Sequence, residues 1–133
     1  MHKQIPPEIA LGTIAFKEDK DCTVKAFAIA MGTSYDIARA HLKLKCGRVD
    51  GRGIVSRMVL PNSLKNTPYR IGPYSKSNRI SLGRFCKEHP VGRFYVSVRG
   101  HAIAVVDGNH YDFVDSPRRM VNWAIRLYPK HLD

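Results

Sequence analysis

The stretch that decides the fold runs from residue 93 to residue 114 and reads RFYVSVRGHAIAVVDGNHYDFV. Apolar and polar side chains alternate in Arg93–Val98, which predicts a half-buried β-strand. His101–Val106 and His110–Val114 are apolar runs on either side of Asp107-Gly108-Asn109. An Asp-Gly or Gly-Asn centre between apolar runs is the strongest short-range signal of a β-hairpin. This stretch therefore predicts three consecutive antiparallel strands.

Helical patterns come before these strands. Asp21 can cap a helix over Cys22–Met31, an alanine-rich segment that Gly32 is placed to end. A second helix is expected over Thr33–Cys46, where Thr33 and Asp36 have the spacing of a capping box. A short third helix is expected over Ser81–Glu88, because Pro90 blocks its continuation.

The remaining segments complete an α+β domain. Leu11–Phe16 predicts a short strand, and the charged run Lys17–Asp21 predicts a loop. The glycines and prolines of residues 47–74 predict loops with at most a brief strand. Apolar residues at helical spacing over Arg118–Tyr128 predict a closing helix. The order of helices first and sheet afterwards, in 133 residues, predicts a single α+β domain over residues 1–133.

The composition is that of a basic globular protein. Hydrophobic residues make up 44% and charged residues 25%, which excludes disordered, collagen-like and coiled-coil chains. Lys plus Arg number 22 against 11 acidic residues, so the formal net charge of +11 will attract polyanions. Nonspecific contact with nucleic acid is therefore expected, although no recognition motif supports specific binding. The loop region intersperses basic residues with two tyrosines that could stack on bases, or that simply form a solvated surface: Arg52, Arg57, Lys65, Arg70, Lys76, Arg79, Tyr69 and Tyr74.

The sequence predicts a cytoplasmic protein without a membrane partner. No apolar run approaches the roughly 20 residues that cross a bilayer, and the first seven residues lack the pattern of a signal peptide. The three cysteines form neither an even set nor a CxxC pair, which indicates reduced thiols.

Cys22 is the candidate nucleophile. A cysteine attacks as its thiolate, and the unpaired N–H groups at a helix N-terminus lower a thiol pKa. Cys22 occupies the first position of a predicted helix. Cys46 and Cys86 lie at a helix end and on an apolar face, where a free cysteine acts as a small buried hydrophobe.

His101 is the candidate general base. It begins an apolar strand directly after Gly100, where the missing Cβ allows close approach of a substrate. The other histidines lie near the termini, on a basic helix, before a proline or near a turn: His2, His131, His41, His89 and His110.

A third polar side chain is expected to hold the imidazole in its useful tautomer. With a hairpin loop of about three residues, His101 is placed opposite Asp115, and opposed residues share a face. Asp112 is the rival, because a register slip of one residue would favour it instead. Asp115 also fits a plain turn, since Asp-Ser-Pro is turn chemistry.

No cofactor or metal is predicted. The sequence lacks GxxxxGK[ST] and GxGxxG motifs, and its cysteines and histidines lack zinc-ligand spacing. Asp107, Asp112 and Asp115 lie in a hairpin without the glycine and glutamate positions of an EF-hand.

These motifs resemble the papain-like cysteine peptidases, particularly the leader-peptide peptidases of bacteriocin exporters and similar small phage proteins. Asp21-Cys22 at the start of an alanine-rich helix resembles their nucleophile segment, and Gly100-His101 with the apolar run after it resembles their histidine strand. Val114-Asp115-Ser116-Pro117 is similar to the strand end that supplies their Asp or Asn. The resemblance covers under a third of the chain. It implies a papain-like fold, with N-terminal helices packed on a small antiparallel sheet and a cleft between them.

The sequence departs from this family at the oxyanion site. The family places a glutamine several residues before the cysteine, whereas residues 15–21 contain none and Gln4 is distant. Lys17 or Lys20 could supply a donor besides the Cys22 N–H, and loss of one donor typically costs ~10²–10³ in rate. Thr23 also stands where the family has glycine.

The resemblance implies a thiol hydrolase of phage or bacterial origin that cleaves a peptide or amide bond through Cys22, His101 and Asp115. The partner would be a peptide or protein substrate, met in the host cytoplasm if the protein is phage-encoded. An alternative is a catalytically weak papain-like fold that acts as a basic binding module for nucleic acid or for a host protein, for example to inhibit a host system. Hydrolysis of cell-wall peptides is a third possibility that lacks a visible export signal.

Overall fold

The protein is described from a computed structural model that covers residues 1–18, 20–49, 51, 59–66, 68–128 and 131. Its described strands form one six-stranded sheet with the order β1-β5-β4-β3-β6-β2. The strands are β1 (His2–Lys3), β2 (Tyr69–Ile71), β3 (Arg93–Val98), β4 (His101–Val106), β5 (Asn109–Tyr111) and β6 (Val121–Leu127). The expected α+β class is confirmed. The sheet is mixed, because β1 pairs with β5 in parallel while the other pairs are antiparallel.

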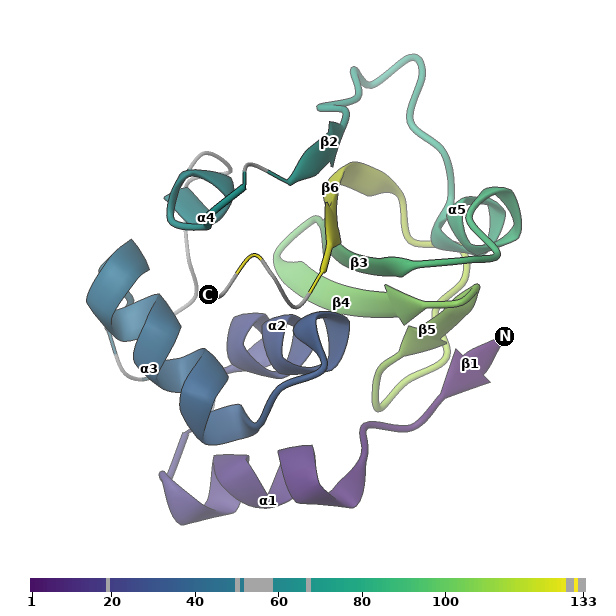
Figure 1. The fold of residues 1–133 in the computed structure, drawn as a ribbon. Coiled ribbons are helices and arrows are strands. Elements are labelled where there is room, and N and C mark those ends of the chain that lie inside the picture. The colour runs from purple at the N-terminus through teal and green to yellow at the C-terminus, as the bar shows by residue number, and fades with distance from the viewer. Residues whose placement is uncertain (19, 50, 52–58, 67, 129–130, 132–133) are drawn as a thin grey trace.

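Helices cover both faces of this sheet (Figure 1). One face carries α1 (Pro7–Ala15), α2 (Cys22–Met31) and α3 (Tyr35–Cys46), and the other carries α5 (Leu82–Glu88). Tyr95 points from β3 into the α2 core, whereas Phe94 and Val96 point into the α5 core. The prediction of a half-buried β3 is therefore wrong, because both of its faces are packed.

The long helices begin and end near their predicted residues. α2 has the predicted bounds, and Gly32 ends it in the left-handed region, with φ of 74°. α3 starts at Tyr35, because the Ser34 side chain accepts from the N–H of Ile37. The expected capping box of Thr33 with Asp36 is thus replaced by a Ser34 cap. In α5, the Ser81 hydroxyl caps the N–H of Arg84.

Two predicted elements have the opposite type. Leu11–Phe16 lies in helix α1 and its end rather than in a strand, and Pro7 stands in the first turn, where its missing N–H costs nothing. The predicted helix over Arg118–Tyr128 is instead a turn followed by strand β6. β6 pairs with β3 along its whole length, so it satisfies an otherwise open strand edge, with Ile125 and Leu127 packed in the α2 core.

Between α3 and α5, the structure describes one short helix, α4 (Val59–Asn62), and the edge strand β2. The brief strand agrees with the prediction, whereas the short helix was not predicted. Arg52 and Arg57 of the basic loop lie outside the described residues. Within the part of the chain that is described, no helix combines the length and apolar character needed to span a membrane.

The β4–β5 hairpin is one residue tighter than predicted. Asp107 and Gly108 form a two-residue turn, with φ of 50° and 78°, as a primed hairpin turn requires. The pairs are Val106 with Asn109, then Val105 with His110, then Ala104 with Tyr111. β5 ends there, so the predicted strand over residues 110–114 is too long. This register decides which carboxylate meets His101.

Candidate active site

Cys22 is the first residue of α2, the helix that packs against β3 and β4. Its thiol is partly exposed, and none of the described cysteines forms a disulfide. Burial raises the pKa of this thiol, but hydrogen bonds from His101, from the Ala102 N–H and from Thr23 outweigh burial and lower it overall. The positive end of the helix acts in the same direction. The surroundings of Cys22 therefore favour the thiolate form of its side chain.

His101 lies at the start of β4, beside the start of α2, and its side chain is 23% exposed. Its Nε2 lies 2.9 Å from Oδ2 of Asp112, which leaves Nδ1 as the ring nitrogen available to Cys22. The hydrogen bond with Asp112, followed by the one with Cys22, raises the pKa of His101 to about 9. The imidazole is therefore protonated at neutral pH, beside a thiol whose pKa is lowered.

Asp112 completes the arrangement. Burial raises the pKa of its carboxyl, but the hydrogen bond and charge of His101 outweigh burial and lower it overall. The Phe113 N–H donates to its second oxygen at 2.8 Å. Asp112 is thus an ionised, oriented acceptor for the His101 ring.

Asp115, the predicted third member, contacts a different histidine. Its Oδ1 lies 3.1 Å from Nε2 of His110. The physical reason is the tighter hairpin, because the two-residue turn shifts the β4–β5 register by one position relative to the prediction. The placement of Cys22 beside His101 follows the prediction, while the carboxylate beside His101 is that of the rival, Asp112.

The same hairpin builds a second set of these three residue types. Cys86 Sγ lies 4.0 Å from Nδ1 of His110, whose other nitrogen faces Asp115. All three line a shallow cleft of about 540 Å³. Burial raises the pKa of Cys86 and lowers that of His110, so this pair is a neutral thiol and a neutral imidazole. Sequence reasoning missed this set, although the spacing of His110 and Asp115 at one strand end was a signal for it.

A buried ion cluster holds the loop that leads to Cys22. Glu18 accepts two hydrogen bonds from Arg48, at 2.8 and 3.2 Å, one from Arg39 at 3.0 Å and one from the Gly51 N–H at 2.8 Å. These donors, Arg48 first, lower the pKa of Glu18 to about 2 against the opposing effect of burial. Arg48 also donates to the carbonyl of Lys20. The cluster therefore ties the residues before Cys22 to the end of α3.

Asp21 precedes Cys22, but its carboxylate does not cap α2 as predicted. It accepts from the hydroxyls of Thr13 and Tyr35 and pairs with Lys25 at 3.1 Å. The carboxylate is consequently turned away from the first N–H groups of α2, which have no partner inside the helix. These N–H groups remain for a negative charge that develops at Cys22.

Gln4 donates to the carbonyl of Phe113 at 3.5 Å, so its amide is engaged one residue from Asp112. Lys17 and Lys20 are both exposed. The Cys22 N–H is therefore the donor that the fold itself places at the nucleophile.

The remaining candidate groups have other partners, although His2 Nε2 lies 2.7 Å from the carbonyl oxygen of Asp112. Burial raises the pKa of Cys46, and His41 contacts the Ser63 hydroxyl at 3.0 Å. His89 contacts the carbonyl of Phe85. Among the residues that the structure describes, no group of three or more His, Cys, Asp or Glu side chains is arranged to hold a metal ion.

Comparisons of the chain with protein-family models, with curated proteins and with solved structures give no match.

Proposed function

We propose that the protein is a thiol hydrolase of the papain-like cysteine peptidase type, which cleaves a peptide or amide bond. The observation that carries the proposal is the hydrogen-bonded series Cys22, His101 and Asp112, assembled from a helix start and two neighbouring strands. A lowered thiol pKa beside a raised histidine pKa is the electrostatic pattern of an activated thiol nucleophile.

The groups support a two-step mechanism. The Cys22 thiolate attacks the carbonyl carbon, forming an S–C bond while the carbonyl electrons move to the oxygen. When the tetrahedral intermediate collapses, the C–N bond breaks and the His101 imidazolium gives its Nδ1 proton to the leaving amine. His101, now neutral, takes a proton from water as the water oxygen attacks the thioester; the S–C bond then breaks, which releases the acid and restores the Cys22 thiolate beside the His101 imidazolium. Asp112 holds the ring through Nε2 in both steps.

The uncapped start of α2 supports stabilisation of the oxyanion. The Cys22 N–H points out of the first turn, and the Asp21 side chain does not occupy it. Without a glutamine, the oxyanion has one fewer donor than in the papain-like family, and one donor is typically worth ~10²–10³ in rate. We therefore expect slow turnover, because acylation and deacylation both pass through a tetrahedral oxyanion.

The basic binding module remains the second candidate, because the net charge of +11 favours polyanion contact without any catalysis. The two candidates differ in what they require of Cys22. A binding module has no use for an ionised thiol held against an imidazole.

An active-site titration tests the proposal. The protein is incubated with a peptide that carries a thiol-reactive epoxysuccinyl group, and the adduct is located by mass spectrometry. We expect one adduct, on Cys22, that does not form in Cys22→Ala and that slows in His101→Ala. Equal labelling of Cys22, Cys46 and Cys86 would contradict the proposal. A panel of fluorogenic peptides then measures turnover, with Cys22→Ala as the blank.

A further inference from the structure

The charge around the Cys22 site is one-sided. The acidic groups next to the site are already neutralised within the protein: Glu18 by Arg48, Asp21 by Lys25 and Asp112 by His101. Each of these carboxylates is largely shielded from solvent. These three carboxylates therefore contribute little negative potential to a molecule that approaches Cys22.

Cationic side chains, in contrast, flank both catalytic groups. Lys20 lies two residues before Cys22, and Arg99 lies in the turn two residues before His101. Arg119 lies close enough to Asp112 for its charge to lower the pKa of that carboxyl. All three are exposed, and no ion pair with another described residue involves them. We call Lys20, Arg99 and Arg119 the basic rim.

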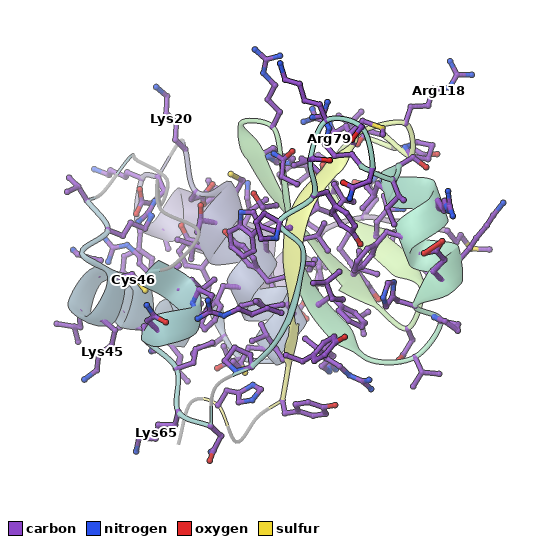
Figure 2. The ribbon with its side chains drawn as sticks, turned by 90° about the horizontal axis from the view of Figure 1, so that it is seen from above. Lys20, Lys45, Cys46, Lys65, Arg79 and Arg118 are labelled. Carbon is purple, nitrogen blue, oxygen red and sulfur yellow. The ribbon has the colours of Figure 1, made fainter. Side chains whose placement is uncertain are left out.

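Two members of the rim lie next to the starts of the two elements that carry the site, Lys20 before α2 and Arg99 before β4. Figure 2 shows Lys20 and Arg118 projecting outward along the same edge of the view, while Lys45 and Lys65 lie toward the opposite edge. Arg118 is the chain neighbour of Arg119 and is likewise exposed. Exposed charges act over about 8–10 Å at ordinary salt, so cations beside the site influence the bond that Cys22 attacks more than remote cations do.

We propose that the acyl substrate of Cys22 is a peptide segment with acidic side chains on both sides of the scissile bond. This inference rests on the proposed function. Lys20 lies on the helix side of a scissile bond held between Cys22 and His101. Arg99 and Arg119 lie on its sheet side. A cluster of aspartates or glutamates would be drawn to these cations and positioned by them.

An acidic peptide fits these observations better than nucleic acid does. A thiolate attacks an acyl carbon, which a peptide offers and a phosphodiester backbone does not. Lys20 and Arg99 each lie two residues from the nucleophile or the base, and the charge of Arg119 acts on Asp112. These cations are therefore associated with the site and not with a surface remote from the thiol. A nucleic acid would use the spread of charge over the whole molecule, Lys45 and Lys65 included.

A pair of small alkylating agents tests the rim without needing a substrate. Iodoacetate and iodoacetamide both form an S–C bond with the thiolate and release iodide, but only iodoacetate is anionic. The rate ratio is the rate with iodoacetate divided by the rate with iodoacetamide, normalised to the same quotient for free cysteine. For Cys22 we expect this ratio to be several-fold above one at low salt and to fall toward one at 1 M NaCl. Arg99→Gln and Lys20→Gln should each lower the ratio, whereas Lys65→Gln, remote from the rim, should not.

The outcomes separate the two proposals. If the ratio at Cys22 equals that of free cysteine while iodoacetamide reacts fast, the proposal of an acidic substrate is wrong. The proposal of a thiol hydrolase is then unaffected. Slow alkylation by both reagents overturns the thiol hydrolase itself.

Matched peptides complete the test. Fluorogenic peptides that differ only in Glu, Gln or Lys on both sides of one bond should show kcat/KM at least tenfold higher for Glu than for Lys. Arg99→Glu should reduce or reverse that preference.

If a single-stranded oligonucleotide protects Cys22 from iodoacetamide at 0.15 M salt better than the Glu peptide does, the rim binds nucleic acid and the proposal is wrong.

Discussion

His101 and Asp112 are joined by a 2.9 Å hydrogen bond that depends on the length of a single turn. The two-residue turn at Asp107-Gly108 ends the paired part of β5 at Tyr111, immediately before Asp112. One more residue in the turn would shift the register and present a different side chain to β4. The hairpin therefore selects which carboxylate orients the imidazole.

This selection predicts different effects for two equivalent substitutions. Asp112→Asn removes the largest contribution to the raised His101 pKa, so the imidazolium and the thiolate both become less stable. We expect the rate of Cys22 alkylation at pH 6 to fall about tenfold or more, since one pKa unit is a factor of ten. Asp115→Asn, the matched control, should change it less than twofold. The pH profile of iodoacetamide alkylation measures both, and an equal loss in the two variants would refute the assignment of Asp112.

The second cysteine–histidine pair should be chemically quiet. Burial raises the pKa of Cys86 and lowers that of its neighbour His110, so neither group is charged at neutral pH. Cys86 in the folded protein should react with iodoacetamide at pH 7 at least about 100-fold more slowly than Cys22. Peptide mapping after timed alkylation gives both rates. Preferential labelling of Cys86 would show that the electrostatic contrast between the two sets is wrong.

The Glu18 cluster should make the fold sensitive to acid. The pKa of Glu18 is lowered to about 2 from an ordinary value of 4.5, so its stabilising contribution is complete above about pH 4.5 and is lost as the pH falls toward 2. A shift of this size corresponds to about 3 kcal/mol of unfolding free energy. Urea unfolding between pH 7 and pH 3 should show the loss.

The matched variants for this prediction are Glu18→Gln and Glu88→Gln. Glu18→Gln leaves the buried Arg48 charge without its partner and should destabilise the protein by about 3–5 kcal/mol at pH 7. Glu88 forms an exposed pair with Arg84, which is worth about 0.3–0.5 kcal/mol. Similar losses in the two variants would contradict a special role for the Glu18 cluster.

The strands and helices that local pattern controls could be predicted from the sequence. α2, β3 and β4 have their predicted bounds, because alternation, alanine content and a closing Gly32 are local signals. β6 could not be predicted in this way. Its apolar residues fit a helical period as well as a strand, and the open edge of β3 that decides between them is a tertiary feature.

The site could be predicted in part for the same reason. Cys22 at a helix start and His101 at a strand start are local features, and the structure brings them together. The choice of Asp112 over Asp115 depends on a register that one residue of turn length reverses. The contacts of Glu18 with Arg39, Arg48 and Gly51 join segments distant in the chain, so no local sequence pattern predicts them.

The most direct test of the central claim is the pH dependence of iodoacetamide alkylation at Cys22, in the native protein and in His101→Ala. An ordinary thiol, with a pKa of about 8.5, is less than about 1% ionised at pH 6. We expect native Cys22 to react at pH 6 faster than such a thiol, because its pKa is lowered, and His101→Ala to reduce the rate at pH 6 by about tenfold or more. A native Cys22 that reacts no faster than a free thiol, or that is unaffected by the loss of His101, would contradict the account.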